Sequence, residues 1–139
     1  MSDLAGAIVA ALRRRANGEQ LRVGVFHRKE FEALGAVIAE GHWTAVAGDN
    51  FRALFLSAQR LGSAGKRSYR LAEARFDALP FRPGSLDALV LTCGLPRGLG
   101  AEAAMKALKR FLAPGGALVF PHPVTDGKRG RFARLLRLP

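Results

Sequence analysis

The sequence predicts an α/β fold with a Rossmann-like, mostly parallel sheet of about five strands and helices on both faces. Short apolar runs such as 86–92 are typical of strands covered on both faces, because such strands need no polar alternation. Segments with apolar residues at helical spacing lie between these runs. Stretches rich in glycine and proline separate the two kinds of segment, as they do in βαβ units.

The first half of the chain alternates helices and strands. A helix over 3–15 begins at an N-cap supplied by Ser2 or Asp3, and its apolar residues recur on one face. The apolar run 21–26 predicts a buried strand, and the helical spacing over 30–41 predicts the next helix. By the same criteria, the following elements are strand 43–49, helix 51–62 and strand 68–74.

The second half of the chain adds two further strands and a helix between them. Proline and glycine in 79–85 predict a loop, and the apolar run 86–92 predicts a strand. Apolar residues at helical spacing predict a helix over 101–112. A Pro-Gly-Gly turn at 114–116 then leads into a last buried strand over 117–121.

One domain is expected to span 1–139, because a chain of this length buries a sizeable core without calling for a second unit. Its parts are an N-terminal helix at 1–16, a core at 21–121 and a basic C-terminal tail at 122–139. No apolar stretch approaches the roughly 20 residues of a membrane-spanning helix. The arginines of the first helix follow its apolar part, unlike those of a signal peptide. A cytoplasmic location is therefore expected.

The chain is strongly basic, with a formal net charge of +11. Such a field attracts nucleic acid, anionic lipid or an acidic protein, although a well-solvated basic surface explains most of these positions. The single cysteine, Cys93, excludes an internal disulfide and fits a reducing compartment. The three histidines, at 27, 42 and 122, are scattered without metal-ligand spacing, so no metal site is predicted.

Three landmarks lie in the second half of the chain: Leu-Pro-Phe at 79–81, Leu-Asp at 86–87 and Leu-Ala-Pro-Gly-Gly at 112–116. In order and spacing they resemble the landmarks of the class I S-adenosylmethionine-dependent methyltransferases. The family carries a Leu-Pro-Phe loop, a Phe-Asp or Leu-Asp pair opening its fourth strand, and a Leu-x-Pro-Gly-Gly turn before its fifth. The resemblance extends over about 21–120. It implies that family's parallel sheet, with S-adenosylmethionine bound at the carboxyl ends of the strands.

The expected cofactor loop departs from the family's pattern. In the family, the first strand ends in an acidic residue and a Gly-x-Gly-x-Gly turn, whose backbone approaches the cofactor because no side chain intervenes. Here the acidic position is Val25, and the glycine positions are His27, Lys29 and Phe31. The resemblance also places Arg75 where the family usually has an aspartate near the adenine. We therefore expect that cofactor binding has been lost.

If the cofactor does bind, the resemblance implies contacts with Asp49, Leu79, Thr92 and Cys93. Asp49 ends the second strand, where the family places the acid that binds the ribose hydroxyls. An N-cap for the next helix is nevertheless the preferred interpretation of Asp49. Thr92 and Cys93 follow the fourth strand and would line the substrate side. No histidine is tied to Cys93 by the sequence, so an inert buried thiol is its preferred interpretation.

After the fifth predicted strand the chain has only a short basic segment, whereas the family's sheet continues with a sixth strand and an antiparallel seventh. A truncated sheet is therefore expected, with an open edge that residues 128–138 or a second copy of the chain can cover. The tail is predicted to form a basic amphipathic helix that packs its apolar face on the sheet. Its candidate contacts for a protein partner or a polyanion are Lys128, Arg129, Arg131, Arg134 and Arg137.

The function predicted from these observations is that of a methyltransferase-like, non-catalytic binding or assembly module, a pseudoenzyme with no favoured cofactor. One alternative is an active methyltransferase with an atypical cofactor loop, which would use S-adenosylmethionine. A second alternative is a small basic nucleic-acid-binding protein, whose binding would depend steeply on salt.

Overall fold

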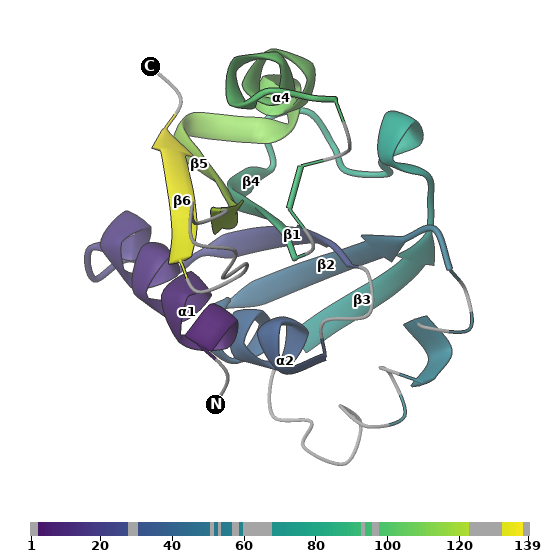
Figure 1. The fold of residues 1–139 in the computed structure, drawn as a ribbon. Coiled ribbons are helices and arrows are strands. Elements are labelled where there is room, and N and C mark those ends of the chain that lie inside the picture. The colour runs from purple at the N-terminus through teal and green to yellow at the C-terminus, as the bar shows by residue number, and fades with distance from the viewer. Residues whose placement is uncertain are drawn as a thin grey trace.

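The computed structural model describes residues 3–27, 31–50, 52, 54–56, 59, 68–92, 94–95, 98–122 and 132–137. Helices and strands alternate along the chain, and Figure 1 shows the strands forming one twisted layer between helices. The elements are α1 (Asp3–Ala16), β1 (Arg22–Phe26), α2 (Phe31–Glu40), β2 (Trp43–Gly48), β3 (Ser68–Glu73), the 3₁₀ helix η1 (Phe76–Ala78), β4 (Leu86–Leu91), α4 (Ala101–Leu108), the 3₁₀ helix η2 (Lys109–Phe111), β5 (Leu112–His122) and β6 (Phe132–Arg137).

The strands form one sheet in the order β3-β2-β1-β4-β5-β6. All pairs from β3 to β5 are parallel, and only β6 is antiparallel to its neighbour. The prediction of a Rossmann-like, mostly parallel sheet is confirmed. The strand order reverses between β1 and β4, and in open α/β sheets ligands bind beside the carboxyl ends of the strands at such a reversal.

One face of the sheet is covered by α1 and α2, which lie side by side (Figure 1). Their apolar stripes fall at helical spacing, so each helix turns one face inward. The core beneath them joins these stripes to the side chains that β1, β2 and β4 project to the same face. Its members include Ile8, Leu12, Val23, Leu34 and Val90, all essentially inaccessible.

The other face of the sheet is covered by α4, η2 and the loop that carries Leu-Pro-Phe. The core here is rich in aromatic residues. The rings of Phe81 and Phe111 meet edge to face, with centroids 5.9 Å apart at 87°. Phe81 therefore anchors the long connection between β3 and β4 to the turn before β5, which explains why this landmark carries an aromatic residue.

The Pro-Gly-Gly sequence at 114–116 lies inside β5 and not before it. Leu86 pairs with Leu112 while Ala88 pairs with Ala117, so β5 carries extra residues in a bulge between these pairs. Gly115 has a φ of 75°, which glycine adopts without steric cost. The predicted strand over 117–121 is thus too short. The predicted helix over 101–112 is too long, because α4 ends at Leu108 and η2 continues the chain.

A sixth strand covers the edge that the sequence predicted to be open. β6 runs antiparallel to β5, from the pair Ala117 and Arg137 to the pair His122 and Phe132. The predicted amphipathic helix is therefore wrong over 132–137. Pairing there satisfies backbone donors and acceptors that β5 would otherwise leave without partners. The sheet thus ends in an antiparallel strand directly beside β5, which the prediction of a sheet truncated after its fifth strand did not include.

The predicted helix over 51–62 falls largely outside the described residues. Within that range, residues 52, 54–56 and 59 are described, and all of them are helical.

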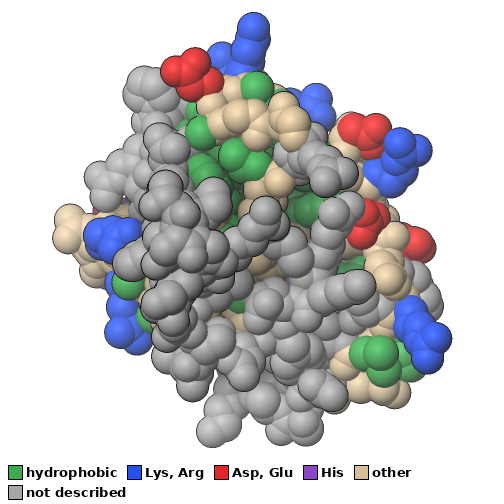
Figure 2. Space-filling model, in the orientation of Figure 1, with side chains coloured by type: hydrophobic (Ala, Val, Ile, Leu, Met, Phe, Trp, Pro, Cys, Tyr) green, Lys and Arg blue, Asp and Glu red, His purple; other side chains and the backbone are tan. Residues whose placement is uncertain are grey.

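Where the surface is described, Figure 2 shows Lys and Arg side chains distributed around the visible face and not gathered into one patch. Among the described helices, none combines the length and apolar character needed to cross a bilayer.

Candidate functional site

The carboxyl ends of four parallel strands meet at one edge of the sheet, which we call the carboxyl edge: residues 26–27, 48–50, 73–79, 91–92 and 94–95. Backbone hydrogen bonds hold these ends together. The N–H of His27 donates to the carbonyl of Ala47 at 2.7 Å, and the N–H of Ala74 donates to that of Gly48 at 2.8 Å. The edge is therefore a fixed framework, and it lies where the resemblance places a cofactor.

His27 is the first residue after β1 and is buried, with 3% of its surface exposed. Burial lowers the pKa of its imidazole from 6.5 to about 4, because a charged ring would lose its hydration there. The ring is consequently neutral at pH 7. The position of the family's first glycine thus carries a buried aromatic ring. Residues 28–30 lie outside the described residues, and Phe31 is described only as the first residue of α2.

Gly48, the last residue of β2, packs against the backbone of His27. A Cβ added at Gly48 would lie 2.8 Å from the carbonyl oxygen of His27 and 3.3 Å from side-chain atoms of Leu54. Only glycine therefore permits this approach between the end of β2 and the turn after β1.

Asp49 is exposed at the carboxyl edge, directly after β2. The carbonyl of Asn50 accepts the N–H of Leu54 at 3.1 Å, which makes Asn50 the N-cap of the helical segment that follows. The preferred interpretation of Asp49 as that N-cap is therefore wrong by one residue. Asp49 is the exposed residue directly after β2, where the resemblance places the acid for ribose recognition.

The residues after β3 form an apolar wall with one exposed ion pair. The rings of Phe26 and Phe76 meet edge to face, with centroids 5.5 Å apart at 74°. Leu79 packs into the same core and is 7% exposed, so little of it faces solvent. Arg75 is exposed, and its guanidinium lies 3.3 Å from the carboxylate of Asp77. Arg75, which the resemblance places near the adenine, is thus paired with a residue two positions along the chain.

Thr92 follows β4 and is buried. Its N–H and its hydroxyl both donate to the carbonyl of Phe26, at 3.3 and 3.4 Å. Thr92 therefore ties the end of β4 to the end of β1, which is a structural role that the sequence did not indicate. Cys93, the other candidate on the substrate side, lies outside the described residues.

The basic tail is described only in part. Lys128, Arg129 and Arg131 lie outside the described residues, whereas Arg134 and Arg137 belong to β6. The helical stripe predicted for Arg131, Arg134 and Arg137 is absent at β6, where the chain is extended. In the part of the chain that the structure describes, no three histidine, cysteine or acidic residues come together as a metal site would require.

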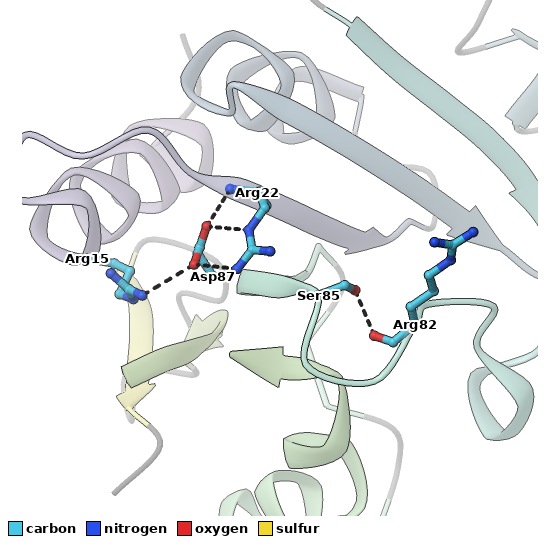
Figure 3. Close-up of polar contacts among 5 residues, drawn as sticks. All are labelled: Arg15, Arg22, Arg82, Ser85 and Asp87. Atoms are coloured by element: carbon cyan, nitrogen blue, oxygen red, sulfur yellow. Dashed lines mark hydrogen bonds and ion pairs between the residues drawn. The ribbon is translucent and has the colours of Figure 1, made fainter. Parts of the chain in front are cut away.

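The structure adds a polar cluster at the opposite, amino end of the sheet (Figure 3). Asp87 accepts the backbone N–H of Arg22 at 2.8 Å, and the Arg22 guanidinium contacts the same carboxylate at 3.2 and 3.3 Å. Arg15, in the last turn of α1, approaches it at 3.7 Å. The sequence marked Asp87 as part of a landmark but did not indicate its partners, which are distant along the chain.

Solved structures with this arrangement include S-adenosylmethionine-dependent methyltransferases. The YcgJ protein from Bacillus subtilis matches with a TM-score of 0.69 and 14% identity, over 85% of this chain and 49% of that chain. A methyltransferase of that class from Mesorhizobium loti matches with a TM-score of 0.58 and 21% identity, over 86% and 56%. The fold is that of the class I S-adenosylmethionine-dependent methyltransferases, and the resemblance inferred from the sequence is confirmed.

In sequence, the chain is 36% identical over 97 residues to a demethylmenaquinone methyltransferase from Thermus thermophilus. The match covers 67% of this chain and 42% of that protein, so the chain spans less than half the length of the curated protein it matches. No family model matches the chain. The activity of the longer protein does not by itself define what this chain does, because a fold supports many functions.

Proposed function

We propose that this methyltransferase-fold chain does not bind S-adenosylmethionine and acts as a non-catalytic binding or assembly module. The observation that carries the proposal is His27, a buried ring at the turn after β1. In the related enzymes, as the resemblance implies, a glycine there lets the backbone approach the cofactor. A side chain at this turn restricts the backbone and fills space beside it.

The neighbouring residues support the same conclusion. Gly48 is already in close approach to the carbonyl of His27, so the backbone at this turn has no room to withdraw toward β2. The sequence continues with Arg28 and Lys29, whose charges would repel the positively charged sulfonium and amino groups of the cofactor. A side chain in place of glycine and two added positive charges both argue against binding of the cofactor.

A second candidate function is methyl transfer with an atypical cofactor loop. Asp49 favours it, because an exposed carboxylate at the end of β2 can accept hydrogen bonds from the two ribose hydroxyls. The sequence match to a demethylmenaquinone methyltransferase supports it as well. In this case the substrate class would be a reduced quinone with a free ring position.

A methyl-transfer assay separates the two candidates. The purified chain is incubated with S-adenosylmethionine and reduced demethylmenaquinone, and S-adenosylhomocysteine is measured. We expect no product above that of a reaction without protein. Product formation that is abolished by Asp49→Asn but not by Asp77→Asn, an exposed carboxylate after β3, would contradict the proposal and favour the enzyme.

The net charge of +11 makes a polyanion a candidate partner of the non-catalytic module. Retention on a heparin column that falls steeply with salt would support nucleic-acid binding, because each neutralised phosphate releases counterions. Elution without retention would remove that candidate.

A further inference from the structure

A groove of about 780 Å³ lies on the α4 side of the sheet, over the amino-terminal part of β2 and residues 70–72 of β3. We call it the arginine groove. The residues that line it include Arg22, Trp43, Ala45, Arg70, Phe81 and Arg82. It lies toward the end of the sheet opposite the carboxyl edge, so it is distinct from the position of a methyltransferase cofactor.

The strand register explains why the sheet is hollow there. Gly24 of β1, Ala45 of β2 and Arg70 of β3 lie in one row across the sheet. Side chains in one row of a parallel sheet point to the same face. The row therefore combines two small residues with a long one at the edge strand, and Leu86 fills the space over Gly24. A depression remains over Ala45.

Aromatic and apolar groups form the walls of this depression. Trp43 lies at the amino end of the floor and is partly exposed. Phe81, held by its edge contact with Phe111, also lines the groove, as does its neighbour Pro80. Ala72 extends the floor along β3. A flat ring on the alanine floor can thus meet aromatic side chains of the lining.

The rim of the groove is cationic. Arg22, Arg70 and Arg82 reach it from three different segments, and no described residue that lines it is acidic. Arg22 is engaged by Asp87, as Figure 3 shows, whereas Arg82 extends away from that cluster. Among the described residues, neither Arg70 nor Arg82 has an acidic partner within ion-pair distance. Two guanidinium groups are consequently available to an anion.

We propose that the arginine groove binds a small aromatic acid, with its ring on the alanine floor and its anionic group between Arg70 and Arg82. The charge complementarity and the aromatic walls favour this class of ligand. The volume is that of a site for a small molecule. Guanidinium groups pair with carboxylates and other oxyanions through two parallel hydrogen bonds, which orients the ligand. The inference goes beyond the proposed function and does not depend on it.

Trp43 is the only tryptophan of the sequence, so its fluorescence reports on this groove alone. The full chain is titrated with anilinonaphthalene sulfonate, an aromatic anion that accepts energy from tryptophan. The uncharged N-phenylnaphthylamine, which has the same rings without the sulfonate, is the matched probe. We expect saturable quenching of Trp43 by the anion and at least about tenfold weaker binding of the uncharged probe.

Substitutions then locate the anion. Arg70→Gln and Arg82→Gln are each expected to weaken binding about tenfold, as the loss of one charge-assisted contact does. Lys106→Gln removes one charge from an exposed position of α4 outside the groove. It is expected to leave the affinity for the anionic probe unchanged. Ala72→Val fills the floor and provides a variant that keeps every charge. Circular dichroism confirms that each variant is folded.

Equal binding of the two probes, or equal effects of Arg82→Gln and Lys106→Gln, would overturn the proposal. Competition separates a small acid from an acidic peptide. Displacement of the probe by naphthoate supports the proposal. Displacement by an oligoglutamate peptide but not by naphthoate would show that the groove is a peptide surface, and would contradict it.

Discussion

The carboxylate of Asp87 in β4 holds the start of β1, because it accepts both the backbone N–H and the guanidinium of Arg22. Arg15 brings the end of α1 to the same group. Partial burial raises the pKa of Asp87, but the hydrogen bonds from Arg22 and the charges of both arginines outweigh it and hold the pKa below 3.8. This one residue therefore joins three elements, and the carboxylate is ionised at neutral pH.

Replacing this carboxylate should cost much of the stability of the fold. We expect Asp87→Ala to lower the free energy of unfolding by about 2–4 kcal/mol, because it leaves the N–H of Arg22 and the largely buried Arg15 without their acceptor. The matched control is Asp77→Ala, since the Asp77 side chain is 68% exposed against 17% for Asp87. That control should change stability by less than about 0.5 kcal/mol. Urea unfolding measures both, and equal effects would contradict the assigned role.

His27 should make stability depend on pH in a defined window. The pKa of His27 is about 4 in the folded chain, whereas an exposed histidine of the unfolded chain has the ordinary value of 6.5. Between pH 4 and pH 6.5 the unfolded chain therefore binds more protons than the folded chain. The free energy of unfolding should therefore fall as the pH is lowered from 6.5 to 4. His27→Gln cannot take up this proton, so its stability should fall less over the same range. Thermal melts across the range test this, and parallel curves for the two proteins would show that His27 is not buried as described.

Two glycines should respond in opposite directions to alanine. Gly48→Ala would place a Cβ 2.8 Å from the carbonyl oxygen of His27, a backbone atom that cannot move aside alone, and should cost about 1–3 kcal/mol. A Cβ at Gly6 in α1 meets nothing within 4 Å. Gly6→Ala should stabilise the helix by about 0.5–1 kcal/mol. Denaturant midpoints of the two variants measure these effects. If Gly48→Ala leaves the free energy of unfolding unchanged, β2 and the turn after β1 lie farther apart than the structure shows.

Much of the fold could be predicted because its signals are local. The apolar runs of β1 and β4 and the landmarks at 79–81 and 112–116 each reflect a short segment's own packing. The strand β6 could not be predicted in this way. Arginines three residues apart, such as Arg134 and Arg137, match a helical stripe, and the free edge of β5 that makes the segment extended is not visible in its own residues.

The candidate site was predictable in position and less so in detail. Asp49 and Thr92 lie at the carboxyl edge as expected. The hydroxyl of Thr92, however, donates to the backbone of Phe26, a partner 66 residues away in the sequence. The arginine groove depends on the register that aligns Gly24, Ala45 and Arg70, and no local pattern encodes that register. Contacts between distant segments are therefore what the sequence left open.

The proposed loss of cofactor binding is tested most directly by calorimetric titration of the chain with S-adenosylhomocysteine, the product that methyltransferases of this class release. We predict no heat of binding up to millimolar ligand, for the chain itself and for Asp49→Asn alike. If the chain binds S-adenosylhomocysteine with micromolar affinity, and Asp49→Asn weakens this binding, the proposal is contradicted. Such binding would show that the cofactor fits beside His27, and would restore methyl transfer as the function.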